Sequence, residues 1–308
     1  MGGKQFFGRS FKLPEFIFFS NYFYGFCAVA LSVEAMLQQR FPLNGFLYFF
    51  IVFITTVLYY GYPYIRKYSV LSSNPRTNWF SRYYTLMVTN QITITVILVL
   101  VLVLFLWNYW PVLLNMPVSQ WWLIFIFPAV AAMYYGINFF SRKYNLRKIG
   151  WLKPFIIGFT WAGLVTIYPV LFYDIIHQLK YDPGLIGGLL FLKNLMFVAV
   201  LCMMFDIKDY ATDYTSQLKT FVVKAGLRFT IYYILIPLTI LGLLTFIYYA
   251  LTHGFHYGKL VLNIIPFALL ILAAISLRRR RSLLYYLVVI DGLMLVKALC
   301  GSVSMIFF

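Results

Sequence analysis

Long apolar runs separated by short polar connections cover almost the whole chain. Nine runs can be read, and each is close to the length of about 20 residues that an α-helix needs to cross the hydrocarbon core of a bilayer. The pattern predicts an all-α, polytopic membrane protein with nine transmembrane helices in a single domain over residues 1–308. The predicted helices are Phe16–Leu37, Leu43–Tyr62, Tyr84–Trp107, Trp121–Phe139, Trp151–Tyr173, Gly184–Phe205, Leu227–Ala250, Leu260–Leu277 and Leu283–Ile306.

The positions of Lys and Arg predict how the chain crosses the membrane. Of the 25 basic residues, 20 lie at the N-terminus or in the connections after the second, fourth, sixth and eighth runs, and three lie in the other connections. Because cytoplasmic loops are enriched in Lys and Arg, this bias places the N-terminus in the cytoplasm and agrees with an odd number of helices. We expect an integral, multi-pass protein of a bacterial plasma (inner) membrane.

The composition supports a membrane protein over a nucleic-acid-binding one. Hydrophobic residues make up 63% of the chain and charged residues 11%, which is too little charge to cover a soluble protein of this length. The net charge of +17 would suit nucleic acid, but basic loops beside anionic lipid headgroups account for it. The sequence has no RNA-binding aromatic motif and no zinc-ligand spacing. We therefore expect the bilayer, and no nucleic acid, as a partner.

Three of the eight acidic residues stand together at the end of the sixth run. Asp206, Asp209 and Asp213 are spaced i, i+3 and i+7, which places their carboxylates on one face of a helix. Like charges this close repel each other unless a cation lies between them, and Mg²⁺ takes carboxylate oxygens while keeping sites for water and phosphate. The alternative is a solvated helix end. The absence of any carboxylate between Glu34 and Asp174 favours the cation site.

This stretch also carries a family resemblance. It reads Asp-x-x-Asp-x-x-x-Asp, followed by Gln217 and Thr220. With nine predicted helices around it, the stretch resembles the second aspartate-rich motif of the UbiA superfamily of intramembrane prenyltransferases, in which Gly is usual where Gln217 stands. The resemblance implies a UbiA-like helical bundle.

Two further stretches are similar to that family. Arg147 and Lys148 precede Gly158 in the fifth run, as a Lys-Arg pair often precedes a Gly in the family. The sequence Asn74-Pro75-Arg76-Thr77 is similar to the Pro-Arg stretch that follows the family's first motif. These two matches are less specific than the aspartate stretch.

The first aspartate-rich motif of the family is missing. Its place at the end of the second run is taken by Tyr59–Tyr68, which contains no carboxylate. Arg66, Lys67 and Arg76 could neutralise phosphate charge there, at about 1.5–3 kcal/mol for each charge-assisted hydrogen bond. The most useful geometric observation is whether Tyr60–Tyr68 faces Asp206–Asp213 across a shared cavity, and which polar atoms it presents there.

The resemblance implies a prenyltransferase. An isoprenyl diphosphate would bind at the cytoplasmic mouth, and its prenyl group would pass to an unknown aromatic or lipid-like acceptor. Asp206, Asp209 and Asp213 would hold Mg²⁺, with Asp209 and Asp213 as the catalytic residues. The diphosphate would be bound by Arg147, Lys148, Lys219 and Arg76.

The missing motif supports a second hypothesis, a non-catalytic protein of the same fold that binds isoprenoids or lipids or acts as a scaffold. A transporter is less well supported, because the sequence shows no internal repeat.

Four charged residues lie within the predicted spans: Glu34, Lys193, Asp291 and Lys297. Charges at membrane depth are costly and usually face the interior of the bundle. Asp291 and Lys297 are six residues apart, so they do not face each other on one helix. Pairing with other helices and a functional role both stay open for these residues.

Overall fold

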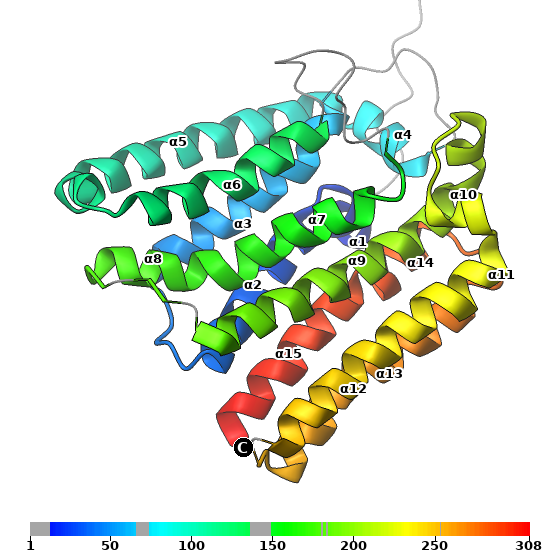
Figure 1. Ribbon diagram of the computed structural model, residues 1–308. Helices are drawn as coiled ribbons and strands as arrows, with labels where there is room; N and C mark the ends of the chain where they lie inside the picture. The colour runs from blue at the N-terminus through cyan, green and yellow to red at the C-terminus, as the bar shows by residue number, and fades with distance from the viewer. Residues whose placement is uncertain (1–12, 66–73, 136–148, 180, 183, 253) are drawn as a thin grey trace, which may run out of the picture.

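Every regular element in the described part of the chain is a helix (Figure 1). The computed structural model describes residues 13–65, 74–135, 149–179, 181–182, 184–252 and 254–308. The helices that follow the apolar runs are α1 Leu13–Phe19, α2 Tyr22–Gln38, α3 Phe46–Gly61, α5 Tyr84–Leu114, α6 Val118–Tyr135, α7 Lys153–Ala162, α8 Tyr168–Ile176, α9 Gly184–Thr215, α12 Ile236–Thr252, α13 Tyr257–Ser276 and α15 Gly292–Phe307. Short helices between or before them are η1 Tyr62–Tyr64, α4 Pro75–Arg82, α10 Phe221–Ala225, α11 Leu227–Phe229 and α14 Leu283–Tyr285.

Seven segments of the described residues are long and apolar enough to cross a membrane, and α1 with α2 make an eighth if the bent pair counts as one span. The pair is bent by 65°, and Asn21 at the break has a left-handed φ of 74°. Helix α6 is a shorter apolar helix. The prediction of an all-α, multi-pass membrane protein is confirmed, whereas nine spans and a cytoplasmic N-terminus stay predictions.

Three of the spans contain a stretch of π-helix. These stretches are η3 Gly163–Ile167 between α7 and α8, η4 Thr230–Leu235 before α12, and η5 Tyr286–Ile290 before α15. A π-turn inserts one extra residue into a helix and so changes which side chains the next turn directs into the bundle. The stretch η5 is important for the candidate site, because it ends one residue before the buried Asp291.

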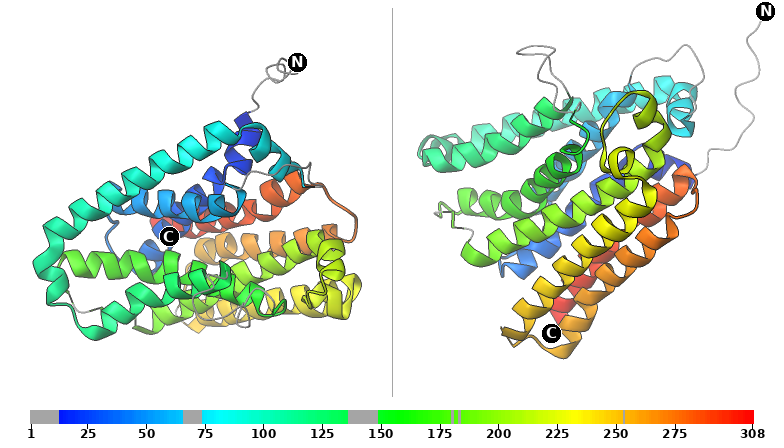
Figure 2. Two further views of the ribbon diagram at one scale, coloured as in Figure 1. Left: turned by 90° about the horizontal axis from the view of Figure 1, so that it is seen from above. Right: turned by 45° about the vertical axis from the view of Figure 1, so that its right-hand side comes forward.

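The helices pack side by side around α9 and α15 (Figures 1 and 2). Helix α9 packs on α7, and α15 packs on α2 and α13. Gly158 permits the close approach of α7 to α9, because an added Cβ there would lie 2.6 Å from the backbone oxygen of Leu195 on α9. Small residues allow helices in membranes to approach in this way.

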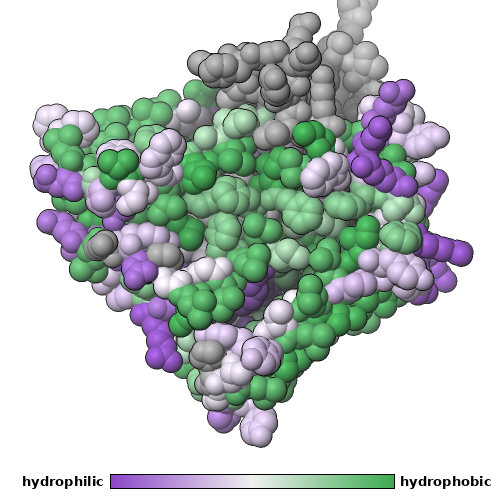
Figure 3. Space-filling model, in the orientation of Figure 1, coloured by the Kyte–Doolittle hydropathy of each residue, from purple (hydrophilic) through white to green (hydrophobic). Residues whose placement is uncertain are grey.

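The outer surface is suited to lipid. None of the residues in the most apolar window of α5 is buried inside the bundle, as expected for a helix that faces hydrocarbon. One face of the molecule shows a broad hydrophobic area across its middle, and hydrophilic residues gather towards its edges (Figure 3).

An ion cluster inside the bundle joins α2, α9 and α15. Glu34 is 1% exposed, and its Oε2 accepts a hydrogen bond of 2.6 Å from Lys297 Nζ. Lys193 Nζ lies 3.6 Å from Glu34 Oε1 and donates to Gln38 Oε1 at 3.1 Å. Three of the four membrane-depth charges are thus paired across helices, and Asp291 has different partners.

Candidate functional site

A cavity of about 880 Å³ lies among α2, α3, α5, α6, α7, α9 and η5–α15. Its size lies in the range of pockets that enclose a drug-sized or cofactor-sized ligand. Most of its wall is apolar, and a smaller part carries charged side chains. The cavity is therefore amphipathic.

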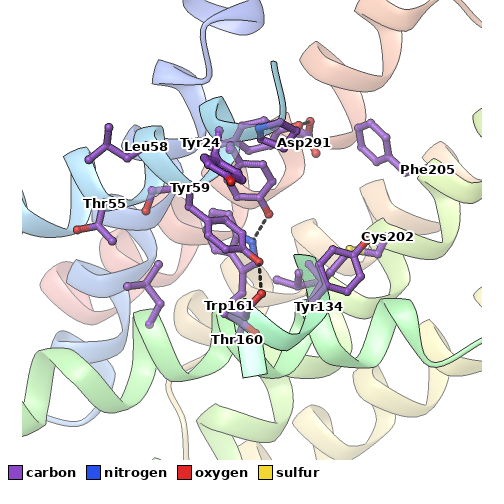
Figure 4. Close-up of a pocket in the computed structure, with 18 of the residues that line it drawn as sticks. Tyr24, Thr55, Leu58, Tyr59, Tyr134, Thr160, Trp161, Cys202, Phe205 and Asp291 are labelled. Carbon is purple, nitrogen blue, oxygen red and sulfur yellow. Dashed lines mark hydrogen bonds between the residues drawn. The ribbon is translucent and has the colours of Figure 1, made fainter. Parts of the chain in front are cut away.

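Aromatic rings form much of the wall (Figure 4). Tyr24 and Tyr60 are stacked with their ring centroids 4.5 Å apart, and the Trp161 indole N–H donates to the Tyr60 hydroxyl at 2.7 Å. These contacts fix three rings from α2, α3 and α7 against one another. The aromatic lining residues are Tyr24, Tyr59, Tyr60, Tyr62, Tyr64, Phe127, Tyr134, Trp161, Tyr168 and Phe205.

Among the described residues, five charged side chains line the same cavity: Arg76, Lys153, Lys208, Asp209 and Asp291. Lys153 Nζ lies 2.6 Å from Asp206 Oδ1, and Lys208 forms an ion pair with Asp209. Lys153 begins α7, and Lys208 lies in the last two turns of α9, so both belong to the same end of the bundle. That end combines positive charge with one exposed carboxylate.

Arg76 has a structural role as well as a place in the cavity wall. Its Nε donates to the Phe19 carbonyl at 2.9 Å, and its guanidinium also donates to Asn21 Oδ1. The guanidinium stands 4.7 Å from the centre of the Tyr64 ring. Arg76 thereby holds the bend between α1 and α2, while its side chain remains beside the cavity.

The three predicted metal ligands have different surroundings. All three lie on α9, but only Asp209 lines the cavity, and its side chain is 39% exposed. Asp206 is fully buried with Lys153 on one oxygen, and its Oδ2 has no hydrogen-bond partner among the described residues. Asp213 is buried outside the cavity lining.

The residues present do not fit a Mg²⁺ ion held by all three aspartates. Within the described ranges, no group of three or more His, Cys, Asp or Glu side chains is arranged to hold a metal ion. Mg²⁺ in phosphate-binding sites often takes only one or two carboxylates and completes its shell with phosphate and water. Asp209 is the one predicted ligand placed to share such an ion with a phosphate group in the cavity.

The tyrosine stretch and the aspartate stretch border one cavity. Tyr59, Tyr60, Tyr62 and Tyr64 line it from the end of α3 and from η1, and Asp209 lines it from α9. Residues 66–68 of the stretch, and with them Arg66 and Lys67, lie outside the described residues. The described part of the tyrosine stretch therefore borders the same cavity as Asp209 and contributes tyrosine side chains where it could have contributed carboxylates.

Two of the four predicted diphosphate-binding residues can be placed. Arg76 lines the cavity, whereas Lys219 lies between α9 and α10 and is not part of the lining. The backbone of Lys219 packs closely on Gly150, just before α7. Arg147 and Lys148 lie outside the described residues.

Lys153, Lys208 and Asp291 line the cavity but were not predicted as site residues. In the sequence, Lys153 and Lys208 stand out only as topology charges, and Asp291 stands out as a carboxylate in an apolar run. The position of Asp291 within an apolar run could have marked it as a candidate site residue, but the sequence did not show that Tyr24 is its partner.

Comparison with protein-family models, with curated proteins and with solved structures finds no match for this chain. The resemblance to the UbiA superfamily therefore rests on the sequence motifs alone.

Proposed function

We propose that the cavity binds an isoprenyl diphosphate and that the chain is a divergent, UbiA-like prenyltransferase of the bacterial inner membrane. The observation that carries this proposal is the amphipathic cavity. Its aromatic and apolar wall suits a hydrocarbon tail, while Arg76, Lys153 and Lys208 suit a diphosphate head. The acceptor would be an aromatic or lipid-like molecule that enters from the bilayer.

The charged end of the cavity would assist departure of the diphosphate. When the allylic C–O bond breaks, its electron pair leaves with the diphosphate, and Lys153, Lys208 and Arg76 stabilise the charge that develops on the oxygens. Asp209 would share a Mg²⁺ ion with the diphosphate, and such an ion supplies additional positive charge at the leaving group.

The aromatic wall would stabilise the other product of this bond cleavage. Tyr60 and Trp161 line the cavity, and aromatic rings attract a cation. The apolar surroundings would also keep water away from the allylic carbocation until the acceptor attacks it.

A specific observation favours a second candidate, a non-catalytic isoprenoid-binding protein. Asp206 and Asp209 are already paired with Lys153 and Lys208, and the described part of the tyrosine stretch has no carboxylate. Less metal-binding capacity than in the family would weaken ionisation of the substrate more than its binding. This candidate predicts tight binding of isoprenyl diphosphate without release of pyrophosphate.

The experiment uses the purified full-length chain in lipid nanodiscs with radiolabelled geranylgeranyl diphosphate and a membrane lipid extract, with and without Mg²⁺. Binding and pyrophosphate release are measured separately. The prenyltransferase proposal expects both from the wild type, and a lower rate of release from Asp209→Asn. Binding without release would establish the non-catalytic candidate, and absence of binding would contradict both.

A double variant tests the basic end. Lys153→Met alone leaves Asp206 buried and unpaired, so the matched change is Lys153→Met with Asp206→Asn. We expect this pair to weaken binding roughly 10-fold or more, as removal of one charge-assisted hydrogen bond does. Lys259→Met serves as the control, because Lys259 lies over the Phe255 ring and outside the cavity lining.

A further inference from the structure

Asp291 is a buried carboxylate in the wall of the cavity. It is 4% exposed, and its Oδ2 accepts a hydrogen bond of 2.6 Å from the Tyr24 hydroxyl. Glu34 and Asp206 each form a salt bridge, but Asp291 forms none with the residues that the structure describes. A carboxylate at membrane depth without a paired cation is costly, and in such a place it indicates a functional group.

The backbone places this carboxylate through a π-turn. The N–H of Asp291 donates to the Tyr286 carbonyl at 3.0 Å, five residues back, which closes the last turn of η5. Helix α15 then begins at Gly292. Single π-turns within helices are frequently found at functional sites, because the extra residue redirects a side chain. Here the π-turn η5 ends directly before Asp291, whose carboxylate belongs to the cavity wall.

Ring contacts hold the Asp291 side chain in a defined orientation. Tyr24 donates to Oδ2, and its ring stacks on Tyr60, whose hydroxyl accepts from Trp161. Figure 4 shows Tyr24 and Asp291 next to each other, with Trp161 farther along the wall. The other oxygen, Oδ1, makes no hydrogen bond with the described residues, so we assign Oδ1 to the ligand.

We propose that Asp291 accepts the proton that a hydroxyl-bearing acceptor loses when it is prenylated. This inference rests on the proposed prenyltransferase function and names the acceptor class, an alcohol or phenol. Before reaction, the acceptor O–H donates to Oδ1 and is thereby oriented towards the allylic carbon.

The C–O bond to the diphosphate breaks, and its electron pair leaves with the diphosphate. A lone pair of the acceptor oxygen forms the new C–O bond, and the hydroxyl proton passes to Asp291. The resulting neutral carboxylic acid later returns its proton to water. The base must lie within hydrogen-bond reach of this proton, so the acceptor oxygen must sit beside Tyr24.

Other groups around Asp291 affect the pH dependence of this step. The charged groups are Arg76 on α4 and Lys208 on α9, and the titratable groups are Tyr24, Cys27 and Cys202. The reaction requires Asp291 in its carboxylate form. The rate of prenyl transfer should therefore rise with pH as Asp291 loses its proton. This rising part of the pH–rate profile is called the acid limb, and we attribute it to Asp291.

The test compares Asp291→Asn with the wild type in nanodiscs, with radiolabelled geranylgeranyl diphosphate as the probe and a membrane lipid extract as the source of acceptor. Binding, pyrophosphate release and labelled lipid product are measured across pH. We expect unchanged binding, a fall of roughly 10²–10⁴-fold in product formation, and loss of the acid limb. Asp174→Asn is the matched control, because Asp174 is also buried in a span but lies outside the cavity lining.

Each outcome decides the inference. If Asp291→Asn forms product at the wild-type rate with the wild-type pH profile, the inference is wrong and the proposed function stands. If the wild type binds no probe or releases no pyrophosphate, the proposed prenyltransferase fails and the inference fails with it. If Asp291→Asn does not fold, the pH–rate profile of Tyr24→Phe is measured instead. A shift of its acid limb supports the role of Asp291, and an unchanged profile overturns that role.

Discussion

Glu34 and Asp291 are carboxylates at membrane depth on two helical segments that pack together, but their surroundings differ. Glu34 is held by Lys297 and Lys193 and lies outside the cavity lining. Asp291 has a tyrosine hydroxyl as its hydrogen-bond partner and lies in the cavity wall. From this difference we infer that Glu34, paired across helices, holds the bundle together, and we propose that Asp291 serves a ligand in the cavity.

The largest expected effect is on the free energy of unfolding, and it should differ between substitutions of Glu34 and of Asp291. Glu34→Gln leaves Lys297 buried without its partner, and removal of one member of a buried pair costs about 3–5 kcal/mol in the free energy of unfolding. Asp291→Asn keeps an acceptor for the Tyr24 hydroxyl, so it should cost no more than about 1 kcal/mol. Unfolding in detergent micelles measures both.

A double variant provides the control for this contrast. Glu34→Gln with Lys297→Met removes both charges and should restore much of the stability, because no unpaired charge is left. If Asp291→Asn destabilised the protein as much as Glu34→Gln does, the distinction between a structural and a functional carboxylate would be lost.

Arg76 contacts the bend between α1 and α2 and also lines the cavity, so we expect its substitution to have an intermediate effect on stability. Arg76→Met removes the hydrogen bonds to Phe19 and Asn21 at the bend of α1 and α2, at a cost of about 1.5–3 kcal/mol. It should also weaken binding of geranylgeranyl diphosphate. Arg82→Met on the same helix is the control, since Arg82 is exposed. Unchanged stability in Arg76→Met would contradict the role of Arg76 at the bend.

Gly158 tests the packing that positions Lys153 against Asp206. Gly158→Val places atoms where the Leu195 carbonyl lies, so α7 and α9 must separate, at a cost of about 1–3 kcal/mol. The control is Gly188→Ala on α9, where an added Cβ meets no atom within 4 Å. Thermal unfolding of the two variants provides the comparison, and equal midpoints would show that the close approach is not needed.

The smallest effect is expected at the exposed basic run. Arg281 lies 4.9 Å from the centre of the Tyr285 ring and is exposed, so Arg281→Ala should cost only about 0.5–1 kcal/mol. Binding of geranylgeranyl diphosphate should stay unchanged. A large loss of binding in this variant would move the phosphate site away from the cavity.

The sequence was sufficient to predict the fold class, because the length and hydropathy of a segment decide whether it can cross a bilayer. The number of spans was harder to predict, because hydropathy does not show the bend at Asn21, and α6 is a shorter helix within the described residues. The spacing of Asp206, Asp209 and Asp213 correctly placed them on one helix, α9. Which carboxylate reaches the cavity depends on neighbouring helices and could not be read locally.

The contacts that define the site join residues far apart in the chain. Lys153 meets Asp206 across 53 positions, and Tyr24 meets Asp291 across 267 positions. Helical periodicity relates positions only a few residues apart, so it cannot find such pairs. For the same reason, the sequence showed Lys153 as a topology charge and Asp291 as a charge without a known partner.

The most direct test of the account is to locate a bound isoprenoid. A photoreactive analogue of geranylgeranyl diphosphate is cross-linked to the chain in nanodiscs, and the labelled peptides are identified by mass spectrometry. We predict labelling of α3 and α7 around Tyr60 and Trp161, and loss of this label when unlabelled geranylgeranyl diphosphate competes. Labelling confined to α12 and α13, which contribute no residue to the cavity lining, or labelling that the competitor does not reduce, would contradict an isoprenyl diphosphate site in the cavity.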